Sequence, residues 1–377
     1  MKIAMLTTVG QRCGIAAYSA QLVASLRALP DTDVEIVPIA VGEQPASHYE
    51  EQARALNAPD VDIVHIQHEF SFWGFPTPGR SRFAELRRLI ERPVVLTAHT
   101  TLALSAMLPT AGKRKPWRWL RKKRLLANRD YRRSVEFATF DADAIIVHTE
   151  AAQKEFAGRG LKEERLFVVP MGVPDPLPPS GDFRERYALH GNRVLTLFGY
   201  ITSNKGYELV LEILATLPRD VVFVIAGGAR LPPEQKYVDH LRRRIALLRG
   251  RNRVIVTGYL PDEGVADAMQ ATDIALVPHT QATNSYSVTL PLSHGRATLA
   301  SDLACFREMA ARGDCLELFR SGDKRDLRRK LVALLDDPPR REQLAANASR
   351  YSERFRWNHV AATTRNIYRA ALNGHRS

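Results

Sequence analysis

The chain has 377 residues, of which 45% are hydrophobic and 25% charged, and it carries a formal net charge of +13. This length fits two domains better than one, and the composition excludes a disordered chain. Cys13, Cys305 and Cys315 are too few and too scattered for a disulfide framework or a zinc site. No apolar run reaches the roughly 20 residues that span a bilayer, and "MKIAMLTTVG" fits a buried strand better than a signal peptide. We therefore expect a cytoplasmic protein that is soluble or at most bound to a membrane surface.

Apolar runs of strand length alternate with amphipathic runs of helix length, which predicts a parallel α/β architecture. Six strands are expected in the first half, at 2–8, 33–40, 61–67, 93–99, 144–149 and 165–170. Five are expected in the second half, at 193–200, 221–228, 253–259, 273–279 and 297–302. Several have almost no polar alternation, as is usual for strands that are covered on both faces.

A proline-rich stretch, "MGVPDPLPPSGDF" at 171–183, is the best candidate for a linker. It predicts an N-terminal Rossmann-like domain at 1–175 and a C-terminal one at 176–355. The tail after about 340 has a helical pattern, and a last helix at 356–377 is expected to pack back towards the N-terminal domain.

Two strand-to-helix loops are candidates for binding phosphate. The first, "TTVGQRCGIAAYSAQL", contains Gly10 and Gly14 before a helix expected near Ile15, where free N–H groups attract an anion. Its glycine spacing does not match a dinucleotide fingerprint, and a structural turn explains it equally well. The second, "LFGYITSNKGYELVLEIL", places Lys205 where a helix starts after Gly199, within reach of a diphosphate. The alternative for this lysine is simple exposure to solvent.

Several residues follow strand ends in the first half. His99 in "VVLTAHTT" lies just beyond a strand, where open α/β sheets bind ligands, although a structural role is the commoner one for a single histidine. His65 and His68 in "VHIQHEFSFWGF" lie on opposite faces of a strand and cannot hold one metal ion together. Glu69 and Trp73 belong to an aromatic loop that either forms an acceptor wall or packs the core.

Three Asp-x-Asp triplets occur, at 31–33, 60–62 and 141–143. Each precedes an expected strand, whereas a metal-binding Asp-x-Asp would follow one. They are therefore expected to be turn residues, and no divalent-metal site is predicted.

The positive charge is concentrated at 112–133, where eleven basic residues and one acidic residue supply +10 of the chain's +13. Basic residues are attracted to anionic lipid by about 1 kcal/mol each, and tryptophan favours the membrane interface. We expect this segment to dock on an anionic membrane surface or a polyanionic acceptor, rather than to form only a solvated helix. The contact residues would be Lys113, Arg114, Lys115, Trp117, Trp119, Arg121, Lys122, Lys123 and Arg124.

Taken together, several segments resemble the retaining GT-B glycosyltransferases of family four (glycosyl transferases group 1). They include "GIAAYSAQLV", "ADAIIVHTEAAQKEF", "VVPMGVPD", "FGYITSNKGYELVLEIL", "VIVTGYLPDEGVADAMQATDIALVPH" and "HGRATLASD", which spread over most of the chain. "VDIVHIQHEFSFWG" and "LTAHTT" are similar to a branch that reads roughly "hIQHEfgifG" and "TlHT". The resemblance implies two Rossmann-like doubly wound domains that face an interdomain cleft, with C-terminal helices.

The resemblance also implies a nucleotide diphosphate sugar as co-substrate, no metal or other cofactor, and a hydroxyl acceptor in glycan, polysaccharide or glycolipid assembly. His99 would contact the transferred sugar, and Lys205 would neutralise the leaving diphosphate. The implied donor-binding residues are Gly14, Gly199, Lys205, Gly258, Tyr259, Leu260, Ser285, Tyr286, Ser287 and Val288. The acceptor-binding residues would be His68, Glu69 and Trp73.

The sequence departs from the family pattern at three places. Tyr200 stands where an arginine usually follows the glycine, Met171 replaces a histidine, and the glutamate pair is absent from "TNSYSVTLPLSHGR". The same branch commonly reads "TSGTLAYAvgaGK" there, so serine hydroxyls and a helix N-terminus would replace the glutamates, with Tyr286 in place of a glycine. A catalytically impaired relative and a sugar-nucleotide epimerase are the alternative functions. Nucleic-acid binding is disfavoured, because no recognised module accompanies the basic segment.

Overall fold

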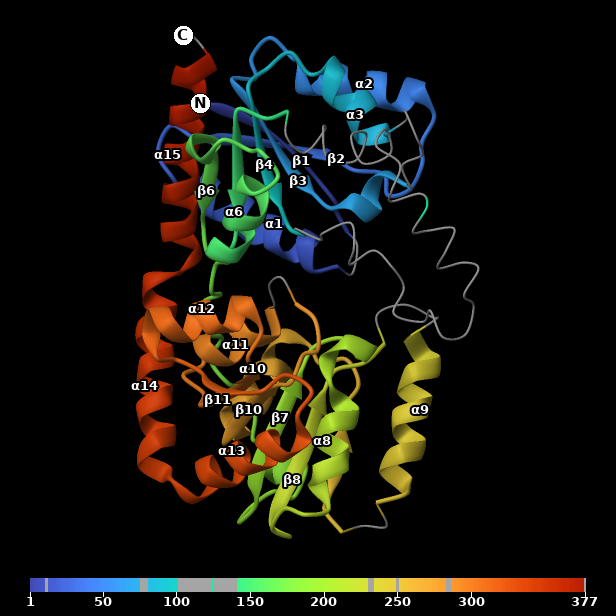
Figure 1. The fold of residues 1–377 in the computed structure, drawn as a ribbon, viewed down its shortest axis with the longest axis vertical. Coiled ribbons are helices and arrows are strands. Elements are labelled where there is room, and N and C mark those ends of the chain that lie inside the picture. The colour runs from blue at the N-terminus through green and yellow to red at the C-terminus, as the bar shows by residue number, and fades with distance from the viewer. Residues whose placement is uncertain are drawn as a thin grey trace. The chain divides into compact units, whose positions relative to one another are not determined.

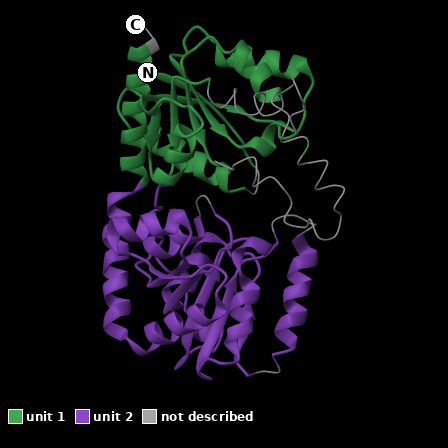
Figure 2. Cartoon of the chain, viewed as in Figure 1, with its two compact units in different colours: residues 1–170, 357–377 green, residues 171–356 purple. Residues whose placement is uncertain are grey.

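The structure is a computed structural model that describes residues 1–10, 13–74, 81–100, 124, 141–229, 234–248, 251–282 and 286–375. The chain divides into two compact units (Figure 2). Met1–Pro170 and Trp357–Ser377 form unit 1, and Met171–Arg356 forms unit 2. The end of the chain therefore folds with its beginning.

Unit 1 is built on a six-stranded parallel sheet in the order β2-β1-β3-β4-β5-β6 (Figure 1). Its strands are β1 (Lys2–Thr7), β2 (Asp33–Pro38), β3 (Ile63–His68), β4 (Val94–Ala98), β5 (Ala144–Val147) and β6 (Leu166–Val168). Every residue of β3, β4 and β5 is buried, which explains the almost entirely apolar character of β4 and β5, whereas β3 also buries His65, Gln67 and His68.

The helices of unit 1 are α1 (Gly14–Arg27), α2 (Ala46–Leu56), α3 (Arg82–Leu89), α6 (Glu150–Ala157) and α15 (Trp357–His375). Helix α1 begins where the sequence predicts, with the Cys13 sulfur accepting the Ala16 N–H. Helix α15 packs on α1 and on the sheet. Its Trp357 ring lies edge-on to Tyr18, with centroids 4.9 Å apart, and its Tyr368 reaches His65.

Unit 2 repeats the plan with the order β12-β11-β10-β7-β8-β9, again parallel throughout. Its strands are β7 (Arg193–Phe198), β8 (Val221–Ala226), β9 (Val254–Val256), β10 (Ile274–Val277), β11 (Thr298–Ser301) and β12 (Glu317–Phe319). Its helices are α7 (Phe183–Arg186), α8 (Tyr207–Leu214), α9 (Gln235–Ala246), α10 (Asp262–Ala271), α11 (Tyr286–Ser293), α12 (Ala304–Gly313), α13 (Lys324–Asp336) and α14 (Pro338–Arg354). The two ends of this unit lie side by side, because the Val173 N–H donates to the Phe355 carbonyl over 2.8 Å.

The predicted α/β class with two Rossmann-like doubly wound sheets is confirmed. All eleven predicted strands are present, and β12 is an additional short edge strand that the sequence pattern did not indicate. The strand order reverses between β1 and β3 in unit 1 and between β7 and β10 in unit 2. Such switch points, at the carboxyl ends of the strands, are where open α/β sheets bind ligands.

The Asp-x-Asp triplets lie before strands, as expected. The Asp143 carboxylate accepts the Val94 N–H over 2.7 Å, and the Asp62 carboxylate accepts the Lys2 N–H over 2.8 Å. These carboxylates therefore hold strand ends together. None of the helices in the described ranges is both long and apolar enough to cross a membrane.

Candidate functional site

Lys205 lies at the switch point of unit 2, in the loop that joins β7 to α8. Its Nζ donates to Ser287 Oγ over 2.7 Å and to the Phe198 carbonyl over 3.4 Å. Ser287 is the second residue of α11, which follows β10, the strand next to β7. The site is thus assembled from two loops that are 82 residues apart in the chain.

Two glycines make this arrangement possible. Gly199 has φ +111°, and a Cβ there would lie 2.9 Å from Ser287 Oγ and would collide with the Lys205 ammonium group. Gly206 has φ +75° and brings the loop against Pro278 at the end of β10. A hydrogen bond joins the two loops here, because the Thr280 N–H donates to the Asn204 carbonyl over 2.8 Å. The side chains of Lys205 and Ser287 therefore occupy space that any other residue at 199 would fill.

The charge of Lys205 is poorly compensated. Burial lowers the pKa of its amine from 10.5 to about 8, although the nearby Glu234 acts in the opposite direction. Within the part of the chain that the structure describes, no carboxylate lies within ion-pair distance of its Nζ. A half-buried ammonium group with no ion-pair partner among the described residues, next to a helix N-terminus, is suited to receive an anionic ligand.

His279, just after β10, is a neighbour of Lys205 that the sequence reasoning did not select. Burial, followed by the charge of Lys205, lowers the pKa of its imidazole to about 3. Neither ring nitrogen has a hydrogen-bond partner among the described residues. It is the last residue of the strand predicted at 273–279, and this position at a strand end was the signal that could have identified it.

The other predicted donor residues follow the same edge of the sheet. Gly258, Tyr259 and Leu260 form the loop between β9 and α10, and Tyr259 is 66% exposed. Tyr286 begins α11 with its ring 6.5 Å from that of Phe198. The Val288 side chain is buried in the core, so only its backbone can contact a ligand. Ser285 lies outside the described residues.

In unit 1, His99 lies just beyond β4, where the sequence predicts it. Its Nε2 is 2.8 Å from Gln67 Oε1, and its ring centroid is 4.9 Å from Tyr18 and 5.3 Å from His148. Burial, followed by the neighbouring His148, lowers the pKa of His99 well below its usual value, so the ring is neutral at pH 7. Gly14 is exposed at the first position of α1, with no atom within 4 Å of where a Cβ would be.

Sequence reasoning missed three of these neighbours: Gln67, His148 and Tyr18. His148 follows the end of β5 as His99 follows β4, so the same pattern could have identified it. Its Nδ1 is 2.9 Å from the Val169 carbonyl. Gln67 and Tyr18 gave no local signal, because their proximity to His99 depends on the order of the strands.

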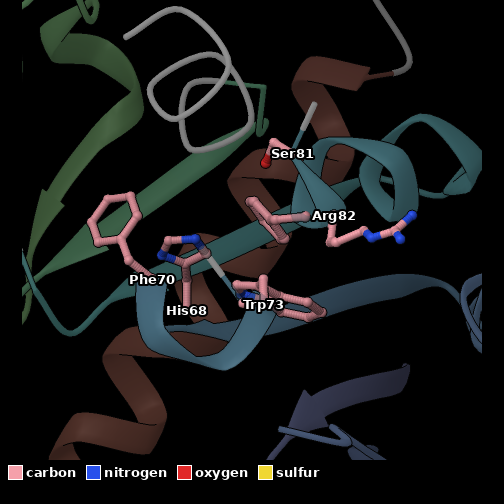
Figure 3. A pocket seen from close by; sticks show the side chains of 7 residues that line it. His68, Phe70, Trp73, Ser81 and Arg82 are labelled. Atoms are coloured by element: carbon pink, nitrogen blue, oxygen red, sulfur yellow. The ribbon is translucent and has the colours of Figure 1, made fainter. Parts of the chain in front are cut away.

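Two of the three predicted acceptor residues, His68 and Trp73, line a small cavity of about 20 Å³ (Figure 3). The His68 ring lies between those of Phe70 and Phe83, at 4.8 and 4.5 Å, and the Trp73 ring lies on Phe83. Burial lowers the pKa of His68 to about 3. His68 and Trp73 are therefore largely core residues, with only a narrow opening beside them.

Glu69 turns to a different partner, the Thr100 hydroxyl, which donates to its carboxylate. Burial raises the pKa of Glu69, although this hydrogen bond opposes the effect. His65 and His68 contact different partners, as expected for opposite faces of β3. Among the residues with described positions, no group of three or more His, Cys, Asp or Glu is placed to hold a metal ion.

The predicted membrane-contact residues at 113–123 lie outside the described residues, and of the whole basic segment at 112–133 only the exposed Arg124 is described.

Two units, each built on a parallel doubly wound sheet, have the architecture of a class of protein, the GT-B glycosyltransferases. The family profile "Glycosyltransferase Family 4" matches residues 19–175, and "Glycosyl transferases group 1" matches residues 181–351. The chain belongs to glycosyltransferase family four.

Relatives and solved structures agree with this assignment. The chain is 25% identical over 316 residues to the phosphatidyl-myo-inositol mannosyltransferase of Mycolicibacterium smegmatis, covering 82% of this chain and 71% of that one. It is 28% identical over 242 residues to the D-inositol 3-phosphate glycosyltransferase of Xylanimonas cellulosilytica, covering 61% and 57%. HepE of Anabaena, solved in complex with UDP, has a TM-score of 0.72 at 19% identity, covering 98% and 100%. WaaG, a glycosyltransferase of lipopolysaccharide biosynthesis, has a TM-score of 0.67 at 16% identity, covering 97% and 99%.

Proposed function

We propose that this protein transfers a sugar from a nucleotide diphosphate sugar to a hydroxyl group of a glycan or lipid-linked acceptor. The observation that carries this proposal is the half-buried Lys205 ammonium group, which binds Ser287 at the switch point of unit 2 and has no ion-pair partner among the described residues. HepE, a similar fold, was solved with UDP and with UDP-glucose, and the mycobacterial relative is named for an inositol phospholipid. The ligands of HepE and the name of the mycobacterial relative both support a protein that binds a nucleotide diphosphate sugar and a carbohydrate or lipid acceptor.

In this mechanism, unit 2 stabilises the charge that grows on the leaving diphosphate. Lys205 supplies a positive charge in a site of low polarity, where its interaction with phosphate is stronger than in water. Ser287 and the N–H groups at the start of α11 donate hydrogen bonds to phosphate oxygens, as expected for a helix N-terminus. Gly199 and the Gly14 loop leave room for close approach, and Gly258, Tyr259 and Leu260 contact the nucleobase through their backbone. These groups neutralise the diphosphate without a metal ion.

Unit 1 contributes the groups that meet the sugar and the acceptor. The neutral His99 imidazole exchanges a hydrogen bond with a hydroxyl of the transferred sugar. Glu69 and the edges of His68 and Trp73 orient the acceptor, whose hydroxyl proton passes to the departing phosphate while the anomeric configuration is retained. On the sequence of 112–133, we further propose that the protein works on the cytoplasmic face of an anionic membrane.

Transfer and hydrolysis assays with UDP-, GDP-, ADP- and dTDP-sugars test the proposal. We expect one donor class to be turned over in the presence of EDTA. Lys205→Met should lower kcat/KM for that donor on the order of 100-fold, because a charge-assisted contact to the leaving group is lost. The matched control is Lys236→Met, at an exposed lysine of α9, which should leave the rate unchanged. Turnover of no donor, or equal rates for Lys205→Met and the wild type, would show that the assignment of this site is wrong.

A further inference from the structure

The amide of Gln67 lies between two histidines of unit 1. Its Oε1 is 2.8 Å from His99 Nε2, and its Nε2 is 3.3 Å from His65 Nε2. The same amide nitrogen donates to the Met5 sulfur over 3.3 Å. Gln67 and His65 are two residues apart on β3 and therefore project from the same face of the sheet.

The chemistry of these atoms determines which way the amide points. A thioether sulfur can only accept a hydrogen bond, so the group facing Met5 is the amide NH2 and not the carbonyl oxygen. The carbonyl oxygen then faces His99, and since it can only accept, His99 Nε2 must carry the proton. Met5 and Gln67 have no exposed surface, so water cannot supply other partners for this amide.

The second histidine closes the network in a consistent way. His65 Nε2 accepts from the Gln67 amide and from the Thr97 hydroxyl, which lies 2.8 Å away. Its proton is therefore on Nδ1, which donates to the Tyr368 hydroxyl over 2.6 Å. Tyr368 belongs to α15. This helix therefore completes a buried hydrogen-bond network that runs through His65 and Gln67 to His99.

We propose that Gln67 is a positioning residue that holds His99 as the neutral tautomer with its proton on Nε2 and with Nδ1 as the acceptor nitrogen. The importance of this tautomer for catalysis rests on the proposed function, in which His99 contacts the transferred sugar. A ring held in this way accepts a hydrogen bond from a sugar hydroxyl and does not donate one at Nδ1. The buried polar pair His65 and Gln67 in "HIQHEF" thereby acquires a physical role.

Long-range ¹⁵N–¹H NMR of the full-length protein, labelled with ¹⁵N-histidine, tests this directly, since protonated and unprotonated ring nitrogens have well-separated shifts. The variant His99→Gln assigns the signals. At neutral pH we expect His99 in the Nε2–H form. Gln67→Met keeps the size of the side chain but removes the carbonyl oxygen, so the His99 signals should move towards a mixture of tautomers. Gln67→Glu restores an acceptor and should restore the Nε2–H form.

The matched control is Gln52→Met, because Gln52 is another buried glutamine of unit 1 and donates instead to the Pro38 carbonyl over 2.7 Å. It should leave the His99 signals unchanged. In assays, Gln67→Met should lower kcat about tenfold, with little change in KM for the donor.

A wild-type His99 protonated on Nδ1, or His99 signals that do not change in Gln67→Met, would overturn the inference. The NMR measurement needs no substrate, so it can fail while sugar transfer is observed. Conversely, a protein that transfers no sugar but shows the expected tautomers would contradict only the proposed function.

Discussion

Replacing Lys205 by methionine should make unit 2 more stable at pH 7, because the charged amine is buried at a cost. The folded protein lowers its pKa from 10.5 to about 8. At pH 7 both the folded and the unfolded states are protonated, and this difference corresponds to roughly 3 kcal/mol against folding. The variant also loses the hydrogen bond to Ser287, worth about 1 kcal/mol. We therefore expect a net gain of about 2 kcal/mol in the free energy of unfolding.

The effect has a defined pH dependence. As the pH rises through about 8, folded Lys205 loses its proton before the unfolded chain does, so the wild type regains stability. At about pH 9.5 the remaining cost is about 1 kcal/mol, and the advantage of Lys205→Met nearly disappears. At a pH above the ordinary lysine pKa, Lys205 is neutral in both the folded and the unfolded state, so the cost of burying its charge vanishes.

Calorimetry or thermal denaturation at pH 7 and at about pH 9.5 measures the difference in stability between Lys205→Met and the wild type. For a unit of this size, 2 kcal/mol corresponds to a rise in Tm of about 4–8 °C at pH 7. Lys236→Met provides the control for replacing a lysine by methionine at an exposed site, and should change stability by less than about 0.5 kcal/mol. A Lys205→Met variant that is less stable than the wild type at pH 7, or equally shifted at both pH values, would refute the argument from burial.

Three further predictions follow from the site and the sequence. Gly199→Ala should lower stability by about 1–3 kcal/mol and weaken donor binding, because of its positive φ and the close Ser287 Oγ; Gly14→Ala, with open space around it, should leave stability nearly unchanged. Equal Tm values for these two variants would contradict the packing described for Lys205. The kcat/KM for the donor should fall as the pH rises above about 8, since neutral Lys205 no longer attracts the diphosphate, and this fall should be absent in Lys205→Arg, whose side chain stays charged. A flat wild-type profile would count against a role for the ammonium charge. In sedimentation with liposomes, the protein should bind vesicles that contain anionic lipid at low salt and be released at high salt, and removal of the charge at 112–133 should abolish binding; binding that is independent of lipid charge would contradict this prediction.

Local sequence patterns were sufficient for most of the fold. The almost unbroken apolar runs at β4, β5 and β8 predicted buried parallel strands, because such runs are stable only when helices cover both faces of a sheet. The strand that was missed, β12, is three residues long and only partly buried, so its pattern is indistinguishable from that of a loop. Its pairing with β11 depends on the neighbouring strand and not on its own residues.

The candidate site was predictable only in part. The sequence by itself placed Lys205 at the start of a helix and His99 just beyond a strand, because the boundaries of strands and helices are local signals. The contacts of Lys205 with Ser287 and of His99 with Gln67 join residues that are 82 and 32 positions apart. They follow from which strands are neighbours in the sheet, a property of the whole fold that no local periodicity contains. Burial by the folded chain likewise determines the pKa of Lys205, and the packing around Met5 determines the orientation of the Gln67 amide. The sequence therefore determined which side chains were available, and the tertiary structure decided their partners and their charge.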